Sequence, residues 1–381
     1  MPVLHVAAMP FPSVQGTQAA VRAMIDAEHE AGRAPSLLTY ARAGYELSPP
    51  WPIHRVADVS RDRSLRSGPS LRKLVSDAQL VLAARRLASK ERPACIVAHH
   101  VEAAAAVLAA RVRPLVFVAH TALGPELPTY LPARARSLAA RAGVALDVSL
   151  ARRADATLAV SPRLAEHLSS ASGRDVRHLP VPWTIPPPIE PAERRKARAR
   201  FGFGPLDPVV LYAGNLDAYQ GLELLARAFA VLSRHRADAR LLVATASAPE
   251  PLEKALWSLG CMERTTFAPL ADEPDRRIAH AAADVACINR AVEGGLPIKL
   301  LDALARGVPS LVSRRATAGL ALGDAAIVVP DDDHEAFAAA ALIAIEARES
   351  APERGRRGVE YVRRAHAPTE YLRVIDQALK R

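Results

Sequence analysis

The sequence predicts an α/β protein built from two domains, each with a parallel sheet. Short apolar runs alternate with helical patterns through the first half of the chain, as in sheets that are covered on both faces. The stretch Pro180–Pro191 then has six prolines in twelve residues, which excludes a central strand or a helix interior. The alternation starts again beyond it. A chain of 381 residues therefore divides into two domains joined by a semi-rigid linker.

The first half shows a regular succession of strand and helix signals. Apolar runs bounded by turn residues predict strands, and apolar residues three or four apart predict helices. Ser161-Pro162 supplies a cap and a first-turn proline for the last helix of this half. The expected strands are Val3–Ala8, Ser36–Tyr40, Ala94–Ala98, Leu115–Ala119 and Ala156–Val160, and the expected helices are Gly16–Glu30, Ser70–Ser89, Glu102–Arg111 and Pro162–Ser169.

The second half repeats the pattern and ends in helical sequence from Glu353 to Arg381, with an interruption near Pro368. Ligands of such sheets bind beyond the carboxyl ends of the strands, and a cleft between two domains is the default site. The expected strands are Val209–Tyr212, Ala239–Ala244, Asp284–Ile288, Ser310–Ser313 and Ala325–Val329, and the expected helices are Gly221–Ser233, Glu250–Leu259, Ile298–Arg306 and His334–Glu346.

These elements give a domain division. We expect an N-terminal Rossmann-like domain over residues 1–182 and a proline-rich linker over 183–192. A second Rossmann-like domain follows over 193–360. The remaining segment, 361–381, is expected to pack back toward the N-terminal domain.

Composition excludes several classes of protein. No apolar run approaches the roughly 18 residues of a membrane-spanning helix, and the first residues lack the basic leader of a signal peptide. Three scattered cysteines form neither a disulfide framework nor a zinc site, so we expect a cytoplasmic protein. The net charge of +10 favours an anionic partner. Aromatic residues are only 4%, which argues against nucleic acid.

The segment from Asp284 to Ser310 carries the strongest chemical signal. It predicts a strand, a loop with Gly294-Gly295, a helix beginning near Pro297, and a further strand. A helix N-terminus binds phosphate, and the two glycines allow close approach of a ligand to the backbone. Lys299 lies in the first helical turn, where it opposes the helix dipole unless an anion is bound. A surface helix with an ordinary Lys–Asp pair explains the spacing equally well.

This segment resembles the nucleotide-sugar loop and helix of glycosyltransferase family 4, whose members are retaining enzymes of the GT-B fold. The variant Leu-Pro-Ile-Lys-Leu-Leu-Asp, residues 296–302, is similar to a subgroup common in bacterial polysaccharide and glycolipid synthesis. The resemblance places the donor phosphates at Gly294, Gly295 and Lys299 and the ribose at Asp302. Arg290 and Leu300 belong to the same donor-binding segment. The family's first carboxylate would fall at Gly294, one place beyond Glu293.

Two segments of the first half resemble the same family. The stretch Met9–Arg22 is similar to its first strand, glycine loop and helix, which places the backbone of Gly16 near the donor diphosphate. A turn glycine before a helix is the simpler explanation of Gly16 alone. The stretch Val116–Tyr130 is similar to the strand end that carries a histidine near the transferred sugar, which implies a catalytic role for His120. His99 and His100 end another strand at the crevice, and one of them is expected to reach the acceptor.

One segment departs from the family. In Leu211–Leu222, Asn215 and Gln220 stand where the family usually has Arg and Lys on the diphosphate. The departure removes two formal charges from the expected donor site.

The resemblance implies a metal-independent hexosyltransferase without a cofactor. It would move sugar from a UDP- or GDP-linked donor to a glycan or lipid-linked acceptor. The alternative is a degenerate GT-B protein that binds a glycan or a partner subunit without turnover, for which the two neutral residues are the best support.

A basic cluster predicts peripheral attachment to the inner face of the membrane, although a solvated basic edge explains it equally well. Its residues are Arg61, Arg63, Arg66, Arg72 and Lys73, with Leu65 and Leu71 among them. The triplet Asp331-Asp332-Asp333 is better explained by turn and capping chemistry than by a metal.

Overall fold

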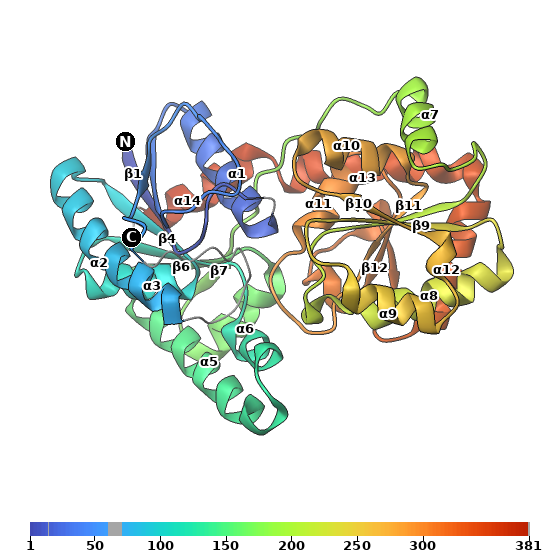
Figure 1. Ribbon diagram of the computed structural model, residues 1–381. Helices are drawn as coiled ribbons and strands as arrows, with labels where there is room; N and C mark the ends of the chain where they lie inside the picture. The colour runs from blue at the N-terminus through green and yellow to red at the C-terminus, as the bar shows by residue number, and fades with distance from the viewer. Residues whose placement is uncertain (14, 60–70, 380–381) are drawn as a thin grey trace.

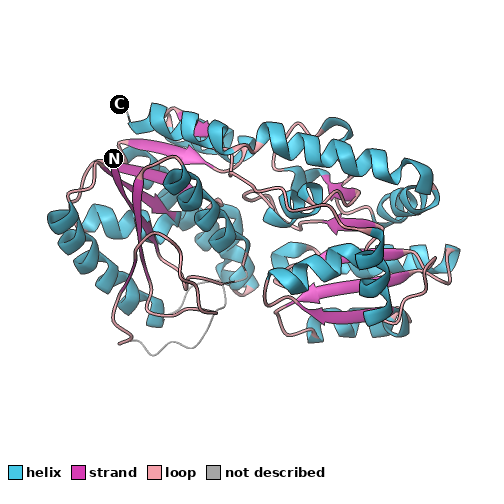
Figure 2. Ribbon diagram, turned by 90° about the horizontal axis from the view of Figure 1, so that it is seen from above, coloured by secondary structure: helices cyan, strands magenta, loops and turns pink. Residues whose placement is uncertain are grey.

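The protein is described by a computed structural model over residues 1–13, 15–59 and 71–379. Two lobes lie side by side, and the chain passes between them twice (Figures 1 and 2). Arg61, Arg63, Leu65 and Arg66 of the expected basic cluster lie outside the described residues, and the side chains of Leu71 and Arg72 are likewise not described.

The N-terminal lobe is built on a parallel sheet. Within the described residues the strand order is β3-β2-β1-β4-β5-β6-β7, and every neighbouring pair is parallel. Neighbouring residues on a strand enter different apolar clusters, as Val3 and Leu4 do, because both faces of the sheet are covered. The strands are β1 (Pro2–Ala7), β2 (Ala34–Thr39), β3 (Ile53–Arg55), β4 (Cys95–His99), β5 (Leu115–Ala119), β6 (Ala156–Ala159) and β7 (Val176–His178).

Helices cover both faces of this sheet. The helix α1 (Gly16–Glu30) packs on one face, and α2 (Leu71–Glu91) and α3 (His100–Ala109) pack on the other. The remaining elements of this lobe are α4 (Leu123–Glu126), η1 (Leu127–Tyr130), α5 (Ala133–Arg153) and α6 (Pro162–Ser172).

The C-terminal lobe repeats the design. Its described strands form a parallel sheet in the order β10-β9-β8-β11-β12-β13. The strands are β8 (Val209–Ala213), β9 (Arg240–Thr245), β10 (Thr265–Pro269), β11 (Val285–Ile288), β12 (Ser310–Ser313) and β13 (Ile327–Val329). The helices and 3₁₀ turns are α7 (Pro191–Arg200), η2 (Ala218–Gln220), α8 (Leu222–His235), α9 (Glu250–Ser258), η3 (Met262–Arg264), α10 (Glu273–Ala282), α11 (Ile298–Ala305), η4 (Arg314–Thr317), η5 (Gly323–Ala325), α12 (His334–Glu346), η6 (Arg348–Ser350) and α13 (Ala351–Ala365).

The last helix, α14 (Pro368–Leu379), returns to the N-terminal lobe. Tyr371 donates a 2.7 Å hydrogen bond to the Glu28 carboxylate on α1, and Arg33 donates to Asp376. Figure 1 shows α14 beside α1 in the N-terminal lobe, whereas α13 lies in the C-terminal lobe. The linker and α14 are joined at His366, whose Nδ1 lies 2.8 Å from the Val181 carbonyl oxygen.

Several elements were not expected from the sequence. These are the edge strands β3, β7 and β10, the helix α10, and the 21-residue helix α5, which projects from the N-terminal lobe (Figure 1). The helix α5 contains five arginines and exposes Leu138, Val144 and Leu146, so its apolar periodicity is weak. The edge strands are only three to five residues long, which is too short for a clear pattern.

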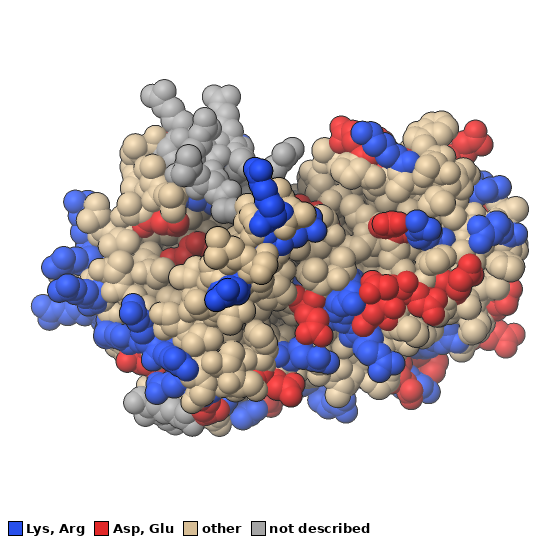
Figure 3. All heavy atoms as spheres, turned by 90° about the horizontal axis from the view of Figure 1, so that it is seen from below, with Lys and Arg blue, Asp and Glu red and all other residues tan. Residues whose placement is uncertain are grey.

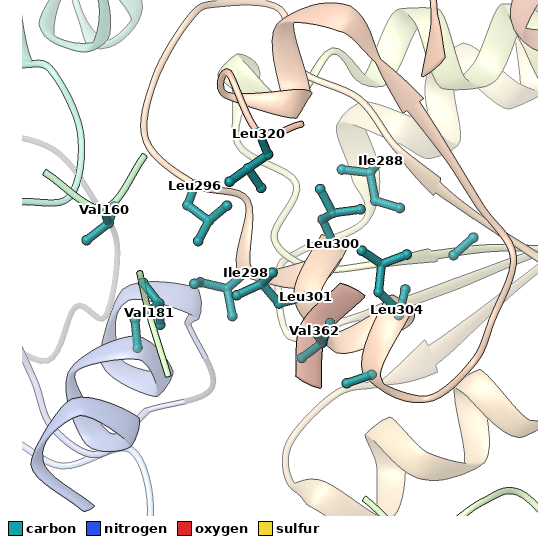
Figure 4. Packing of buried hydrophobic residues seen from close by; sticks show 14 of the residues in the cluster. Val160, Val181, Ile288, Leu296, Ile298, Leu300, Leu301, Leu304, Leu320 and Val362 are labelled. Carbon is teal, nitrogen blue, oxygen red and sulfur yellow. The ribbon is translucent and has the colours of Figure 1, made fainter. Parts of the chain in front are cut away.

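One apolar cluster joins the lobes. Figure 4 shows Val160 and Val181 of the N-terminal side near Leu296 and Ile298 of the C-terminal lobe. Ile298 begins α11, so the helix that carries Lys299 is anchored on both lobes. Among the described helices, none combines the length and the hydropathy that a membrane crossing requires.

Buried histidines make the fold sensitive to acid. Burial, together with the neighbouring His366, lowers the pKa of His178 to about 4, and burial lowers the pKa of His366 to about 4. In the unfolded chain these groups titrate near 6.5, so below that pH unfolding takes up protons that the folded state does not hold.

We therefore expect the contribution of these two histidines to the free energy of unfolding to be fully present above pH 6.5 and to fall between pH 6.5 and 5. Each such histidine contributes up to about 1.4 kcal/mol per pH unit. Denaturant titrations at pH 7, 6 and 5 measure this slope, and His178→Gln should reduce it. A stability that is the same at pH 7 and pH 5 would contradict the neutral burial of these histidines.

Candidate functional site

The candidate site lies where two helix N-termini face each other across the lobes. The helix α11 follows β11, and its first residue, Ile298, contacts the start of α1: a Cβ on Gly16 would lie 3.2 Å from the Ile298 Cβ. Neither helix has an acidic residue in its first turn. Both positive ends are therefore directed at the crevice without local compensation, an arrangement that favours a bound anion.

Lys299 lies against Tyr212, and neutral groups hold it there. Its ammonium donates to the Tyr212 hydroxyl at 3.1 Å and to the Gln220 Oε1 at 2.7 Å, and it lies 4.2 Å from the centre of the Tyr212 ring. Burial, with a smaller contribution from Arg290, lowers its pKa well below the usual range. Within the described part of the chain no carboxylate forms an ion pair with Lys299.

Arg290 is the second cation of the site. Its guanidinium lies 5.7 Å from the centre of the Tyr219 ring, and its Nε is buried without a hydrogen-bond partner among the described residues. Burial lowers the pKa of Arg290, although Tyr219 and Glu126 act in the opposite direction. Two neighbouring cations that form no ion pair with the described residues favour the binding of an anion.

Asn215 and Gln220 lie beside Lys299. Gln220 accepts from Lys299 through Oε1 and donates through Nε2 to the Asn215 Oδ1. The Asn215 amide nitrogen in turn donates to Asp217 and to the Tyr219 hydroxyl, at 3.0 Å for the latter. The two neutral amides therefore form a hydrogen-bonded pair, which contacts the ammonium of Lys299 through Gln220.

Two residues expected at the donor have other contacts in this structure. The Asp302 carboxylate accepts from Arg306 Nε at 3.0 Å and faces Arg276 Nη1 at 3.7 Å and His280 Nε2 at 3.9 Å, with 5% of the residue exposed. Leu300 is fully buried in the core, and its N–H donates to the Pro297 carbonyl oxygen at 2.9 Å. A ribose would have to share Asp302 with these partners.

The glycine loop closes the crevice against the N-terminal lobe. A Cβ on Gly295 would lie 1.5 Å from the His120 carbonyl oxygen, so only glycine fits the contact. A Cβ on Gly294 would lie 3.6 Å from Thr121 Oγ1. Next to the loop, Glu293 forms an exposed ion pair with Arg163 of α6 at 3.3 Å.

Two cavities bear on the location of the site. A small one beside Lys299, inside the C-terminal lobe, is also lined by His280 and Ala303 and has a volume of about 10 Å³, room for about one water. A larger cavity of about 290 Å³ lies at the amino ends of β6 and β7, around Asp155 and Arg174, at the opposite edge of the N-terminal sheet from the crevice. Since ligands of parallel sheets bind at the carboxyl ends, we assign the site to the crevice.

The strand-end histidines form a stack. His120 follows β5, its Nε2 lies 3.0 Å from His99 Nδ1, and the His100 ring stacks on it at 4.8 Å between centroids. His100 has a φ of +70°, a strained conformation for a residue with a side chain. His99 is fully buried behind His120. Of the two neighbours, only His100 therefore lies toward the crevice.

The aspartate triplet has local roles, as the turn chemistry predicts. Asp331 accepts from the Arg315 N–H at 2.7 Å, Asp332 pairs with the Arg315 side chain, and Asp333 caps α12. Among the described residues no group of three or more His, Cys, Asp or Glu side chains converges in a metal-binding geometry.

Sequence reasoning missed Tyr212 and Tyr219, the rings on which the two cations lie. The available signal was a tyrosine at the end of a buried strand, followed by Ala-Gly-Asn.

Comparison with known proteins agrees with this architecture. The profile described as Glycosyltransferase Family 4 matches residues 14–193, and that of Glycosyl transferases group 1 matches residues 207–347. The chain belongs to the family 4 glycosyltransferases. Its two facing parallel-sheet domains form the GT-B fold.

Individual relatives are distant. D-inositol 3-phosphate glycosyltransferase of Nocardia farcinica is 29% identical over 175 residues, which is 42% of this chain and 38% of that protein. The match therefore spans less than half of the relative. Sucrose-phosphate synthase from Thermosynechococcus elongatus has a TM-score of 0.83 at 19% identity and covers 100% of this chain and 98% of its own. HepE of Anabaena, solved with UDP and glucose, has a TM-score of 0.79 at 16% identity, with both chains fully covered.

The contact of Gly295 with His120 gives a test of closure in this family 4 protein. We expect Gly295→Ala to separate the lobes, because the new methyl group would meet backbone. Gly294→Ala is the matched control, since its methyl group would meet the flexible end of Arg290 at 2.6 Å. Small-angle scattering should show a larger radius of gyration for Gly295→Ala only. Equal radii for the two variants and the wild type would contradict the closed arrangement.

Proposed function

We propose that the chain is an active glycosyltransferase that takes a sugar from a nucleoside-diphosphate donor. The observation that carries the proposal is the pair Lys299, in the first turn of α11, and Arg290, in the loop before that helix, neither of which forms an ion pair with a carboxylate in the described chain. Family membership supports the same conclusion. The diphosphate supplies the charge that these groups lack.

The reaction follows from this placement. As the bond between the anomeric carbon and the diphosphate breaks, negative charge develops on the leaving group beside Lys299, Arg290 and the start of α11. Stabilisation of that charge by preorganised donors lowers the barrier. His120 and Thr121 face the same loop from the N-terminal lobe, where the acceptor oxygen would form the new bond to the anomeric carbon and give its proton to the leaving diphosphate. By analogy with the family, we propose retention at the anomeric carbon.

The donor and acceptor are proposed by class. A UDP- or GDP-linked hexose is the proposed donor, and the UDP and glucose in HepE support the first of these. A glycan or a lipid-linked sugar is the proposed acceptor. Diphosphate recognition by Lys, Arg and backbone N–H groups requires no metal ion, so we propose metal-independent transfer.

The closed crevice limits access. The Gly294–Gly295 loop rests on the N-terminal lobe, because a Cβ on Gly295 would lie 1.5 Å from the His120 carbonyl oxygen. We propose that this loop moves away from His120 when the donor binds. The second candidate, a glycan-binding protein without turnover, is favoured by this closure and by the neutral Asn215 and Gln220.

Nucleotide titration calorimetry tests the site. We expect UDP or GDP to bind the wild type, with affinity unchanged by EDTA. Lys299→Met should cost about 1.5–3 kcal/mol, or roughly tenfold or more in Kd, because a charged hydrogen bond is lost. Lys254→Met on the exposed face of α9 is the control. If no nucleotide binds at millimolar concentration, the non-catalytic alternative replaces the enzyme.

A variant of Gln220, one of the two neutral amides beside Lys299, tests the same site by a gain of affinity. Gln220 is 5% exposed and lies 2.7 Å from Lys299 Nζ. Gln220→Lys should tighten nucleotide binding by about 1 kcal/mol and lower the melting temperature of the free protein, because two ammonium groups then face each other. Gln220→Met supplies the uncharged comparison. Weaker nucleotide binding by Gln220→Lys would place Gln220 away from the phosphates.

We also propose that the outward face of α2 attaches the enzyme to anionic membranes. The helix exposes Leu74 and Leu82 beside Arg85, Arg86 and Lys90. In the view of Figure 3, basic side chains predominate at the outer end of the N-terminal lobe on the left, while both signs are mixed on the other lobe.

Vesicle flotation at low salt should show binding to anionic but not neutral lipid. Each basic residue near such a surface contributes about 1 kcal/mol, and salt screens it. Replacing Leu82 by Asp should abolish flotation, while Trp257→Asp on the other lobe should not. Flotation that is equal for both variants would exclude this face.

A further inference from the structure

A line of buried side chains crosses the N-terminal lobe and ends at His120. Glu28 of α1 faces His5 of β1, with 3.5 Å between Oε2 and Nε2. His5 Nδ1 lies 3.0 Å from His99 Nε2, and His99 Nδ1 lies 3.0 Å from His120 Nε2. The most exposed of these four residues is His120, at 6%. His99 therefore uses both ring nitrogens, whereas His5 Nε2 and Glu28 Oε2 approach each other without a hydrogen bond, and His120 Nδ1 has no partner among the described residues.

The carboxylate at one end determines the direction of every hydrogen bond in the line. An ionised carboxylate only accepts, so the 3.5 Å approach of Glu28 Oε2 favours the form of His5 that carries its proton on Nε2 over the form with a lone pair there. A neutral His5 then has a lone pair on Nδ1, which accepts from His99 Nε2–H. His99 in turn accepts at Nδ1 from His120 Nε2–H. The remaining nitrogen of His120, Nδ1, is therefore a hydrogen-bond acceptor.

The surroundings keep Glu28 charged and keep His99 and His120 neutral. Burial opposes ionisation of Glu28, but His5, Tyr371 and Arg33 together lower the pKa of its carboxyl below the usual value. Burial, followed by the neighbouring histidines, lowers the pKa of His99 well below its usual range, and burial and His100 do the same for His120.

Other ionisable groups also face the line. Cys95 and Arg33 lie near its Glu28 end, and Glu102, Glu126 and Lys73 lie near His100 at the crevice end. None of them hydrogen-bonds to His5, His99 or His120 in the described structure. The tautomer of His120 is thus controlled through His99 and not by a direct contact with charge.

We propose that Glu28, His5 and His99 are positioning residues that hold His120 in the Nε2–H tautomer, so that Nδ1 accepts a hydrogen bond from a substrate hydroxyl in the crevice. The assignment of a substrate to that hydroxyl rests on the proposed function. The tautomer itself does not.

The arrangement has a clear chemical use. A histidine free to exchange tautomers presents Nδ1 as an acceptor only in one of its two neutral forms, so exchange weakens a contact that needs that acceptor. A fixed acceptor at the strand end selects a hydroxyl that can donate, and the neutral ring remains an acceptor through the pH range in which free histidine becomes protonated.

The decisive measurement is the protonation pattern of the histidine nitrogens in the full chain, by ¹⁵N–¹H correlation NMR at neutral pH. We expect Nε2–H for His5, His99 and His120 in the wild type. Glu28→Gln has nearly the same shape but also donates, so it should release the bias and give mixed tautomers at His120. Tyr371→Phe is the matched control, because it removes the 2.7 Å hydrogen bond to the other Glu28 oxygen but keeps the carboxylate.

The wild-type spectrum alone can overturn the proposal: Nδ1–H at His120, or a mixture of tautomers, is incompatible with it. This outcome does not depend on the folding of any variant. An unchanged His120 tautomer in a folded Glu28→Gln protein would also reject control by the carboxylate.

Kinetics separate this proposal from the proposed function. In Glu28→Gln we expect kcat for sugar transfer to fall about tenfold or more, with nucleotide Kd unchanged within about twofold. Because the carboxylate's negative charge favours protonated histidine, we also expect its removal to move the acid limb of the pH profile to lower pH. Equal loss in Tyr371→Phe would indicate a structural role only. If the wild type binds no nucleotide, the proposed function fails, while the NMR result still decides whether Glu28, His5 and His99 fix the tautomer of His120.

Discussion

The burial of Lys299 beside Arg290 is the interaction on which the candidate site depends. A buried cation is costly unless it is paired, and here the partners are a phenol, an amide and an aromatic ring. These groups solvate the ammonium without neutralising it. The first turn of α11 adds repulsion, because it is the positive end of the helix. The surrounding fold thus holds positive charge in the crevice that a bound anion would compensate. A diphosphate, with its charge spread over several oxygens, can contact both cations and the free N–H groups at once.

The crevice that carries this positive charge is closed by contacts between the two lobes. Gly295 rests on the His120 carbonyl oxygen, and Gly16 lies against Ile298, so the elements that would bind the donor also bring the lobes together. The lobes are connected by the linker and by the segment between α13 and α14. His366 ties these two crossings, because its carbonyl oxygen accepts from the Trp183 N–H at 2.9 Å. We therefore expect the lobes to open about the linker and the segment between α13 and α14, which His366 holds together.

The sequence predicted the two-sheet architecture well, because buried strands and capped helices leave local patterns. It also brought Lys299, Gly294, Gly295 and His120 to one crevice through motifs that are each continuous in sequence. The helix α5 was not predicted, because its arginine-rich surface obscures the periodicity of its apolar residues. The line of buried side chains from Glu28 to His120 was not predicted for a different reason. Its four residues lie on or next to four separate elements, and only the strand order β1-β4-β5 places the three histidines side by side. No spacing rule along the chain encodes that contact.

The neutral residues at positions 215 and 220 follow from the same electrostatics. A lysine at position 220 would place a second ammonium beside Lys299, with Arg290 close by. All three cations would lie on the C-terminal lobe, where repulsion between like charges is large away from water. Gln220 avoids this, because its oxygen accepts from Lys299 while its amide nitrogen donates to Asn215. The amides thereby permit Lys299 to be buried without a ligand, at the cost of weaker contact with the diphosphate. Affinity for the donor and the stability of the free C-terminal lobe are thus opposed through a single side chain.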